Sequence, residues 1–521
     1  MRIIVGKFIV NIGFYCKFAL YNLKYETNMK KTLLLSSILI AAVPTALAEY
    51  VTLGDGTEYT LDALSQIAES GVTKDGSTYV MLDNVTIAEG DKFAIEDGVT
   101  VKMGDGVQLR IEGEASLEAA TAVTVTRNAD TDSPEGIGLF SEARDVTVVK
   151  GINFEYAGLR AWTTKEVVVR DCSFKYCNGE ISSAGALSMA ESGGLLDVSG
   201  CEFIENAVPA IGGAANFNYG VVIEDCYFYD NNTENANKPQ LNITVGGDRD
   251  IVIRNNTIVG NERNKVGAIA VSNMLGASGS NNVLIEGNDM RKHRYGITTN
   301  GAMNVRIIDN EIVDNKYESN AMNGGSGISI YDSNYNQTAV ITGNHIEGNL
   351  WGITVIGGGN VNIGKTEDSS AEDYNPGGNV FVDNGNGGAL YDLYNNGQNT
   401  IYAQGNKWNV AEQTEELIET VITHKNDIAS LGEVIFMPPM ESSGVAGVKT
   451  QGCYFDSVGK QVVMSEAGND SQVMVYAASG ALVARRCVVN GAADLSDLAS
   501  GVYVVVVTSN DGKQTALKCC L

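Results

Sequence analysis

Two acidic side chains, Asp289 and Glu311, occupy the same position in two consecutive copies of a recurring phrase, GNDMRK and DNEIVD. If these phrases are stacked strands, the two carboxylates lie about 5 Å apart, the ordinary strand spacing. Carboxylates that close repel unless they share a proton or a cation, so they can bind calcium or form a retaining-glycosidase pair. The alternative is a solvated ion-pair ladder, because Glu224, Arg254 and Glu286 alternate in charge along a neighbouring column.

Basic side chains and a histidine accompany this pair. Arg291 and Glu347 stand two residues after the acidic position in their own phrases, and His345 occupies the acidic position of the next phrase. An arginine or Lys292 can meet an anionic sugar, or remove a proton in a calcium-assisted lyase. The candidates for catalysis are Asp289, Glu311, Arg291 and His345; whether the chain is an enzyme stays open.

Aromatic side chains add a second kind of chemistry. Tyr295 and Trp351 each stand directly before a Gly-Ile segment, while Tyr331 and Tyr335 are expected on a loop. An exposed ring binds the C–H face of a sugar at little entropic cost, although rings also simply fill the edge between coils. The predicted binding set is Tyr295, Trp351, Arg291 and Glu347.

The phrases that carry these residues share one template. An Asn or Cys anchor has apolar residues five and three positions before it, an apolar residue two positions after it and a polar residue five positions after it. The anchors are Cys172, Cys201, Cys226, Asn256, Asn288, Asn310, Asn344, Asn379 and Asn406, with Ile152 as an earlier member. The column five residues later contains Cys177, Asn206, Asn231, Asn261, His293, Asn315, Asn349 and Asn384.

Alternating short segments in a repeat of 20 to 35 residues indicate β-strands stacked into a solenoid. Strand spacing then places Asn256, Asn288 and Asn310 in one file, where each inward amide can donate to the next. A leucine-rich or helical solenoid is disfavoured by the β-branched segments, and a propeller by the repeat length. The sequence therefore predicts an all-β right-handed parallel β-helix, in which His293 replaces an Asn of the ladder.

The ends of the chain predict its domain organisation. From Met29, two lysines, an apolar run and Ala46-Leu47-Ala48 have the three parts of a secretory signal, so residues 1–48 are read as a leader. Residues 49–440 are assigned to the β-helix, with a cap that has helical spacing over 412–423 and a closing strand at 434–436. Residues 441–450 read as a linker and 451–521 as a small β-sandwich.

Composition limits the partners. The chain carries 36 basic and 63 acidic residues; without the six basic residues and one acidic residue of the leader, the balance is 30 − 62 = −32. Such a surface disfavours nucleic acid, and a polyuronate would need a local basic patch or a bridging cation. The apolar run of the leader is short for a membrane span, and no later segment reaches that length.

The cysteines give no metal-site spacing. Eight remain after the leader, and an exported location permits disulfides whose pairing the sequence leaves open. Cys172, Cys201 and Cys226 are expected to be small buried anchors, while Cys453 and Cys487 can link the tail.

Residues 80–440 resemble secreted bacterial β-helix proteins of the pectate-lyase-like superfold, on the entry VTIAEGDKFAIEDGVTVKMGDG, the recurring Asn phrase and the exit ITHKNDIASLGEVIFMPP. The resemblance implies the architecture, because this superfold serves lyases, hydrolases, epimerases, adhesins and non-enzymes. The Gly-His-Gly phrase and paired aspartates of its polygalacturonases do not occur, so neither that active site nor the lyase site can be carried over by residue.

The last 70 residues resemble a type IX secretion C-terminal sorting domain of the Bacteroidetes type. The matching segments are VMVYAASGALV, DLSDLASGVYVVVVT and DGK, whereas the terminal ALKCCL lacks the lysine run of that family. The resemblance implies a small β-sandwich, outer-membrane secretion machinery as a partner and a secreted or surface-attached protein.

These observations leave three hypotheses. The first is a β-helix that binds or processes polysaccharide along its lateral face, with no cofactor other than a possible calcium ion at Asp289 and Glu311. The second is a non-catalytic structural or adhesive surface protein. The third is a calcium-assisted polysaccharide lyase with Arg291 or Lys292 as base.

Overall fold

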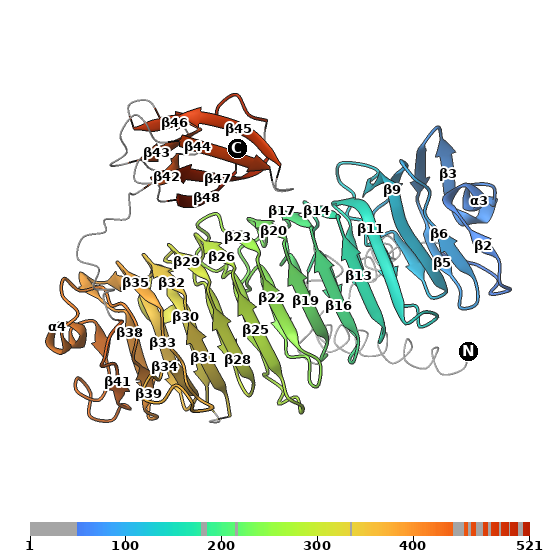
Figure 1. Cartoon of the computed structure of the whole chain (residues 1–521). Coiled ribbons are helices and arrows are strands. Elements are labelled where there is room, and N and C mark those ends of the chain that lie inside the picture. Colours follow the sequence, from blue (N-terminus) through green and yellow to red (C-terminus); the bar gives the residue numbers. More distant parts are fainter. Residues whose placement is uncertain are drawn as a thin grey trace, which may run out of the picture. The chain divides into compact units, whose positions relative to one another are not determined.

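The computed structural model describes residues 49–178, 185–213, 217–333, 336–440 and, in the C-terminal region, 453–456, 460–464, 472–477, 481–488, 491–499, 501–508 and 514–520. The chain divides into two compact units, Met1–Met440 and Glu441–Leu521. The predicted leader and linker lie outside the described residues. The first unit is a parallel β-helix whose coils stack along the chain (Figure 1), as the repeat predicts.

Most coils contribute one strand to each of three sheets, here called sheets 1, 2 and 3, whereas the last two coils have no strand in sheet 3. Sheet 1 has fourteen strands in chain order. They are β1 (Glu49–Val51), β5 (Asn84–Ile87), β8 (Gln108–Ile111), β10 (Gly136–Leu139), β12 (Gly158–Ala161), β15 (Leu187–Met189), β18 (Ile211–Gly213), β21 (Leu241–Thr244), β24 (Ile269–Ser272), β27 (Ile297–Asn300), β30 (Ser326–Asp332), β33 (Trp351–Gly357), β38 (Leu393–Gly397) and β40 (Ile422–Thr423).

Sheet 2 precedes the anchor residue of each coil. Its strands are β2 (Glu58–Tyr59), β6 (Lys92–Ala94), the first parts of β9 (Glu114–Arg127) and β11 (Val146–Glu155), β13 (Glu166–Arg170), β16 (Leu195–Ser199), β19 (Gly220–Glu224), β22 (Ile251–Arg254), β25 (Asn282–Glu286), β28 (Asn304–Ile308), β31 (Thr338–Thr342), β34 (Asn360–Gly364), β39 (Ile401–Ala403) and β41 (Val434–Ile435).

Sheet 3 follows the anchor. Its strands are β3 (Val72–Asp75), β4 (Thr78–Met81), β7 (Thr100–Met103), the last parts of β9 and β11, β14 (Ser173–Lys175), β17 (Glu202–Ile204), β20 (Tyr227–Tyr229), β23 (Thr257–Val259), β26 (Asp289–Arg291), β29 (Glu311–Val313), β32 (His345–Glu347) and β35 (Val380–Val382). A small antiparallel hairpin, β36 (Gly385–Asn386) with β37 (Ala389–Leu390), projects beside the last coils.

The anchor column forms the predicted amide ladder between sheets 2 and 3. The Nδ2 of Asn256 donates to the Oδ1 of Asn288 at 2.9 Å, and the Nδ2 of Asn288 donates to that of Asn310 at 3.0 Å. The ladder continues through Asn344 and Asn379 to Asn406, each step 2.9 Å. Because every buried amide has a partner one coil away, the polar file costs little to bury and fixes the register of the coils.

Apolar side chains fill the interior beside this ladder. Phe154, Phe174, Phe203 and Phe228 stack face to face, with successive ring centroids 4.8, 4.7 and 4.9 Å apart. Cys172, Cys177, Cys201 and Cys226 are free thiols buried in the same region, as small apolar anchors should be. Burial raises the pKa of the Cys177 thiol, so it stays protonated. The side chains of Cys453 and Cys487 lie outside the described residues.

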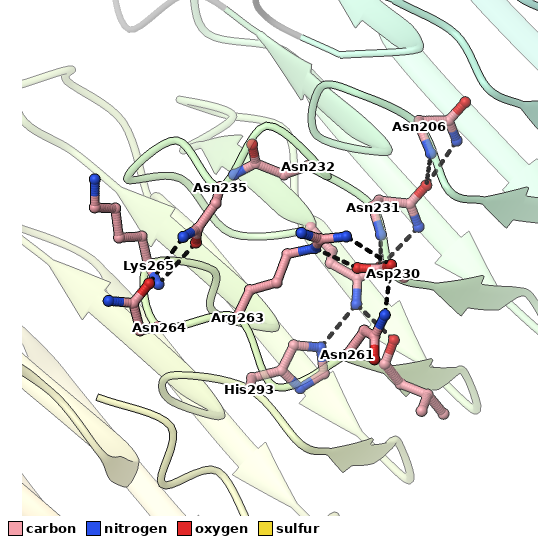
Figure 2. A network of polar contacts seen from close by, with 12 residues as sticks. Asn206, Asp230, Asn231, Asn232, Asn235, Asn261, Arg263, Asn264, Lys265 and His293 are labelled. Carbon is pink, nitrogen blue, oxygen red and sulfur yellow. Dashed lines mark hydrogen bonds and ion pairs between the residues drawn. The ribbon is translucent and has the colours of Figure 1, made fainter. Parts of the chain in front are cut away.

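The second amide file departs from the prediction at one coil. Asn206 donates to Asn231 at 2.6 Å (Figure 2). Asn231 then donates to Gln240, which contacts His293 at 2.7 Å. The prediction that Asn261 belongs to this file is wrong, since its amide donates to Asp230.

Asn261 is displaced because a neighbouring carboxylate competes for its amide. Asp230 is 3% exposed and receives two hydrogen bonds from Arg263, at 2.5 and 2.9 Å. The Nδ2 of Asn261 completes this cluster at 2.9 Å (Figure 2). Gln240 has the length to span the missing step, so the file stays hydrogen-bonded without Asn261.

Short helical segments close the two ends of the β-helix. At the first coil, α3 (Leu61–Ser65) is capped by Thr60 and followed by the 3₁₀ turn η1 (Ala68–Ser70). At the last coil, α4 (Glu415–Glu419) is shorter than the predicted helical spacing, because residues 422–423 pair with β38 instead. Among the described residues, no helix is long and apolar enough to cross a membrane.

The second unit contains two antiparallel sheets. One has β42 (Cys453–Asp456), β43 (Gln461–Met464) and β46 (Ala492–Asp494); the other has β45 (Leu482–Cys487), β44 (Gln472–Ala477), β47 (Val502–Thr508) and β48 (Gln514–Cys520). Valines 462, 473, 475, 488, 505 and 507 form its core with Ala493 and Leu495.

Candidate functional site

The predicted acidic pair lies on the outward face of sheet 3. Asp289 and Glu311 are partners in the register of β26 and β29, as the repeat predicts. Arg291 lies between them: its Nε is 2.6 Å from an oxygen of Asp289, and its Nη2 is 3.4 Å from Glu311. The guanidinium therefore supplies the positive charge that relieves the repulsion of the two carboxylates.

The next coil has a similar pair. His345 aligns with Glu311 in β32, and its Nε2 is 2.7 Å from an oxygen of Glu347. All of these side chains are between about one third and one half exposed, which is typical of a surface ion-pair ladder.

A hollow on the outward face of sheet 1 brings together a different set of residues. Its volume is about 390 Å³, and its floor is formed by β27, β30, β33 and β38. Two files of side chains cross these strands. Thr298, Ser329, Thr354 and Tyr394 form a file in which every side chain carries a hydroxyl group, and Asn300, Tyr331, Ile356 and Asn396 form the second file.

Most of these polar groups have no internal partner. Ser326 and Thr354 are hydrogen-bonded to each other at 2.9 Å. The side chains of Thr298, Ser329, Asn300 and Asn396 make no hydrogen bond within the part of the chain that the structure describes. The floor therefore offers hydroxyl and amide groups to a ligand.

Aromatic rings line the same hollow. The ring of Trp351 lies 4.7 Å from that of Tyr391 and 5.5 Å from that of Tyr394, centroid to centroid. Tyr331 is 39% exposed and belongs to β30, so the prediction that it lies on a loop is wrong; Tyr335 lies outside the described residues. Small Ser326 aligns with Trp351 on the preceding strand, so no bulky side chain covers the indole from that position.

The segment between β29 and β30 forms one wall of the hollow. It contains the 3₁₀ turn η2 (Ala321–Asn323), capped by Asn320, and Met322 on it is 77% exposed. The indole nitrogen of Trp351 donates to the carbonyl of Ala321 at 2.8 Å. The wall is therefore held directly by the largest ring in the hollow.

Arg294 also holds this wall, from the opposite side. Its Nε is 3.1 Å from an oxygen of Glu318, and its two terminal nitrogens donate to the Asn323 carbonyl and to Asn237. Arg294 and Glu318 are only 15% and 11% exposed. Arg294 is the one charged residue that contributes to the described lining of the hollow.

Tyr295 lies beside Arg294 and is partly covered. Its ring occupies the space over Gly267, where an added Cβ would lie 2.1 Å from the ring atoms. Burial raises the pKa of the Tyr295 hydroxyl to about 12, so the group stays neutral and acts as a packing and hydrogen-bonding surface.

The sequence candidates thus fall into two groups. Tyr295 and Trp351 line the hollow of sheet 1, together with the floor residues that the sequence reasoning missed. Asp289, Arg291, Glu311, His345 and Glu347 lie on sheet 3. The wall lies in the interval between the anchors Asn310 and Asn344, which are 344 − 310 = 34 residues apart. Because Asn344 and Asn379 are 379 − 344 = 35 residues apart, anchor spacing alone does not mark the hollow.

A cluster in the cap has metal-ligating types but is explained without a metal. Glu419, His424 and Asp427 lie close together. The Nδ1 of His424 accepts the backbone N–H of Val434 at 2.9 Å, so Nε2 carries the proton and donates to Glu419 at 2.9 Å. A metal on Nε2 would require the fully deprotonated ring, so His424 is a structural hydrogen-bonding group.

Two further hollows lie on sheet 2, with volumes of about 420 and 500 Å³. They share Arg306, Thr338 and Val340, and the second is bordered by Tyr374, which is 39% exposed. Neither contains a stack of rings comparable to that around Trp351 among the described residues.

Comparison with known proteins gives one family. The model described as "Right handed beta helix region" matches residues 70–275 and 236–367, together more than half of the chain. The chain belongs to this family. A search of curated proteins finds no match.

Two solved structures that match most of this chain are distant from it in sequence and in structure. The periplasmic alginate epimerase AlgG has 13% identity and a TM-score of 0.36, over 73% of this chain and 83% of that chain. The receptor-binding protein of bacteriophage Det7, a tailspike, has 10% identity and a TM-score of 0.32, over 97% of this chain and 100% of that chain.

Proposed function

We propose that this β-helix protein binds an extended polysaccharide in the hollow of sheet 1. The proposal rests on Trp351, a half-buried indole backed by Tyr391 and Tyr394. It stands over a floor of hydroxyl and amide groups, most of which have no hydrogen-bond partner within the described residues. A sugar has an apolar C–H face and an equatorial rim of hydroxyls, so it matches a ring beside such a floor.

The direction of the ligand follows from the repeat. The file of hydroxyl-bearing side chains runs from strand to strand across four coils, at a spacing of about 4.8 Å per coil, and the second file is polar at every coil except that of Ile356. A chain that lies along the axis of the β-helix would meet equivalent hydroxyl or amide groups at each step. This geometry favours an unbranched oligosaccharide over a compact small molecule.

The lyase and glycosidase hypotheses receive less support. Both require Asp289 and Glu311 to face a cation or a substrate, yet Arg291 already lies between them at 2.6 and 3.4 Å. The contacts of Arg291 with two carboxylates also fit a structural ion pair better than a proton-accepting base. Binding in sheet 1 therefore remains the function that the geometry supports best.

The test is calorimetric titration of residues 49–440 with neutral and acidic oligosaccharides, using Tyr331→Ala and a matched control. Tyr331 and Tyr374 are both 39% exposed, but Tyr374 lies at the hollow of sheet 2. Tyr331→Ala is expected to weaken binding about tenfold, roughly the value of one stacked ring, and Tyr374→Ala to leave it unchanged. The reverse pattern would move the site to sheet 2, and no binding by any sugar would reject the proposal.

We also propose that the second unit is a type IX sorting domain and that the protein is secreted or attached to the cell surface. Its two antiparallel sheets around a valine core agree with the small sandwich that the sequence resemblance implies. Deleting residues 441–521 should leave the β-helix inside the cell envelope of the producing bacterium. Export that is unchanged by the deletion would contradict this assignment.

A further inference from the structure

The residues that line the hollow of sheet 1 also bear on the charge of the ligand. We infer that the hollow is built for a neutral glycan and discriminates against uronates, because its one cation is already neutralised by Glu318. This inference rests on the proposed function and names the substrate class.

The positive charge of Arg294 is balanced by a carboxylate of the protein itself. Its Nε lies 3.1 Å from an oxygen of Glu318 without forming a hydrogen bond to it, and its two terminal nitrogens donate to the Asn323 carbonyl and to the Asn237 side chain. Both members of the ion pair are nearly buried, at 15% and 11% exposure. A uronate entering the hollow would therefore meet a site without net positive charge, inside a chain whose formal charge is −27.

The remaining contacts suit uncharged hydroxyl groups. Thr298, Ser329 and Tyr394 can each donate one hydrogen bond and accept others, and the amides of Asn300 and Asn396 do both. Sugar hydroxyls are likewise donors and acceptors, whereas a carboxylate only accepts. The floor contains both donors and acceptors, so all of its groups can form hydrogen bonds with the hydroxyls of a neutral sugar. A carboxylate in the same place would leave acceptors of the floor without a hydrogen-bond donor.

The experiment compares two ligands that differ only at one carbon of each sugar, which carries a hydroxyl group in one ligand and a carboxylate in the other. Hexasaccharides of β-linked glucose, mannose and galactose are titrated alongside the same sugars oxidised at the primary alcohol to the uronate. The neutral form is expected to bind at least about tenfold more tightly, with an affinity that is independent of salt. Equal or tighter binding of the oxidised form would overturn the inference but would leave the proposed glycan binding intact. If neither form binds, the proposed function itself is rejected.

A gain-of-binding variant gives a second, independent readout. Glu318→Gln removes the charge that neutralises Arg294 but preserves the shape of the pair, so affinity for the oxidised sugar should rise about tenfold while affinity for the neutral sugar stays constant. The double variant Glu318→Gln/Arg294→Gln should lose this gain, with thermal unfolding confirming that each variant is folded. If Glu318→Gln does not raise uronate affinity, the masking role of Glu318 is wrong.

Discussion

The indole nitrogen of Trp351 and the carbonyl of Ala321 are joined by a hydrogen bond of 2.8 Å. This bond connects the ring that is proposed to stack on sugar with the wall that encloses it. Occupation of the hollow and order in residues 317–325 are therefore expected to be coupled, since both depend on the position of one side chain.

Trp351→Phe tests this coupling. The variant keeps a ring for stacking but loses the indole N–H that donates to the Ala321 carbonyl. We expect hydrogen–deuterium exchange in residues 319–323 to accelerate several-fold in the unliganded protein, because a hydrogen bond contributes about 1 kcal/mol to local stability. Exchange at the buried ladder residues 307–312 serves as the control and should not change; unchanged exchange in the wall would contradict the coupling.

Asn288→Ala tests the amide ladder. Asn288 accepts from the Nδ2 of Asn256 and donates to Asn310 and to the carbonyl of Ile253, at 2.9, 3.0 and 2.9 Å. Truncation leaves buried donors and acceptors unpaired, so the free energy of unfolding should fall by about 3 kcal/mol. Asn282→Ala is the matched control, because Asn282 is exposed and makes one hydrogen bond, to Asp250.

His293 is expected to make the stability of the folded protein depend on pH. Complete burial lowers the pKa of His293 to about 4, whereas an unfolded histidine titrates near 6.5. Between these values the unfolded chain binds a proton that the folded chain does not, so stability falls as pH falls from about 6.5 to 4, by up to about 3 kcal/mol. His293→Asn restores the ladder residue and should flatten this slope in urea titrations; an unaltered slope would assign it to other groups.

Asp392 is expected to make the free energy of unfolding depend on pH in the opposite direction. Burial raises the pKa of Asp392 to about 7 from the usual 3.8, although the backbone N–H of Asn409 donates to it at 2.8 Å. The folded chain then holds a proton that the unfolded chain releases, so stability falls as pH rises from about 4 to 7. Asp392→Asn should remove this loss and make the protein more stable than the parent at pH values above 7. A variant that is less stable there would show that the ionised carboxylate is required.

Much of the architecture follows from residue types alone. The files of Asn, Val, Ile and Phe repeat at one position per coil, so strand spacing fixes which residues stack, as the register of Asp289 with Glu311 confirms. The exchange of Asn261 for Gln240 could not be foreseen, because it depends on Asp230 and Arg263 meeting at a corner and drawing the Asn261 amide away.

The hollow was predictable only in part. Trp351 and Tyr295 stood out as rings before Gly-Ile strands, but the floor residues Thr298 and Ser329 are ordinary strand positions in the sequence. They become part of a hollow only because the wall built by residues 316–325 stands beside them. The position of this wall depends on long-range contacts of Arg294 and Trp351, which no local sequence pattern encodes.

The most direct measurement is hydrogen–deuterium exchange of the β-helix with and without a saturating neutral oligosaccharide. Binding in the hollow predicts protection of residues 317–325 and 351–356. Residues 338–340 on sheet 2, residues 372–374 at the border of the sheet 2 hollow and residues 289–291 on sheet 3 should be unchanged. Protection of sheet 2 or sheet 3 with no change around Trp351 would contradict the central claim.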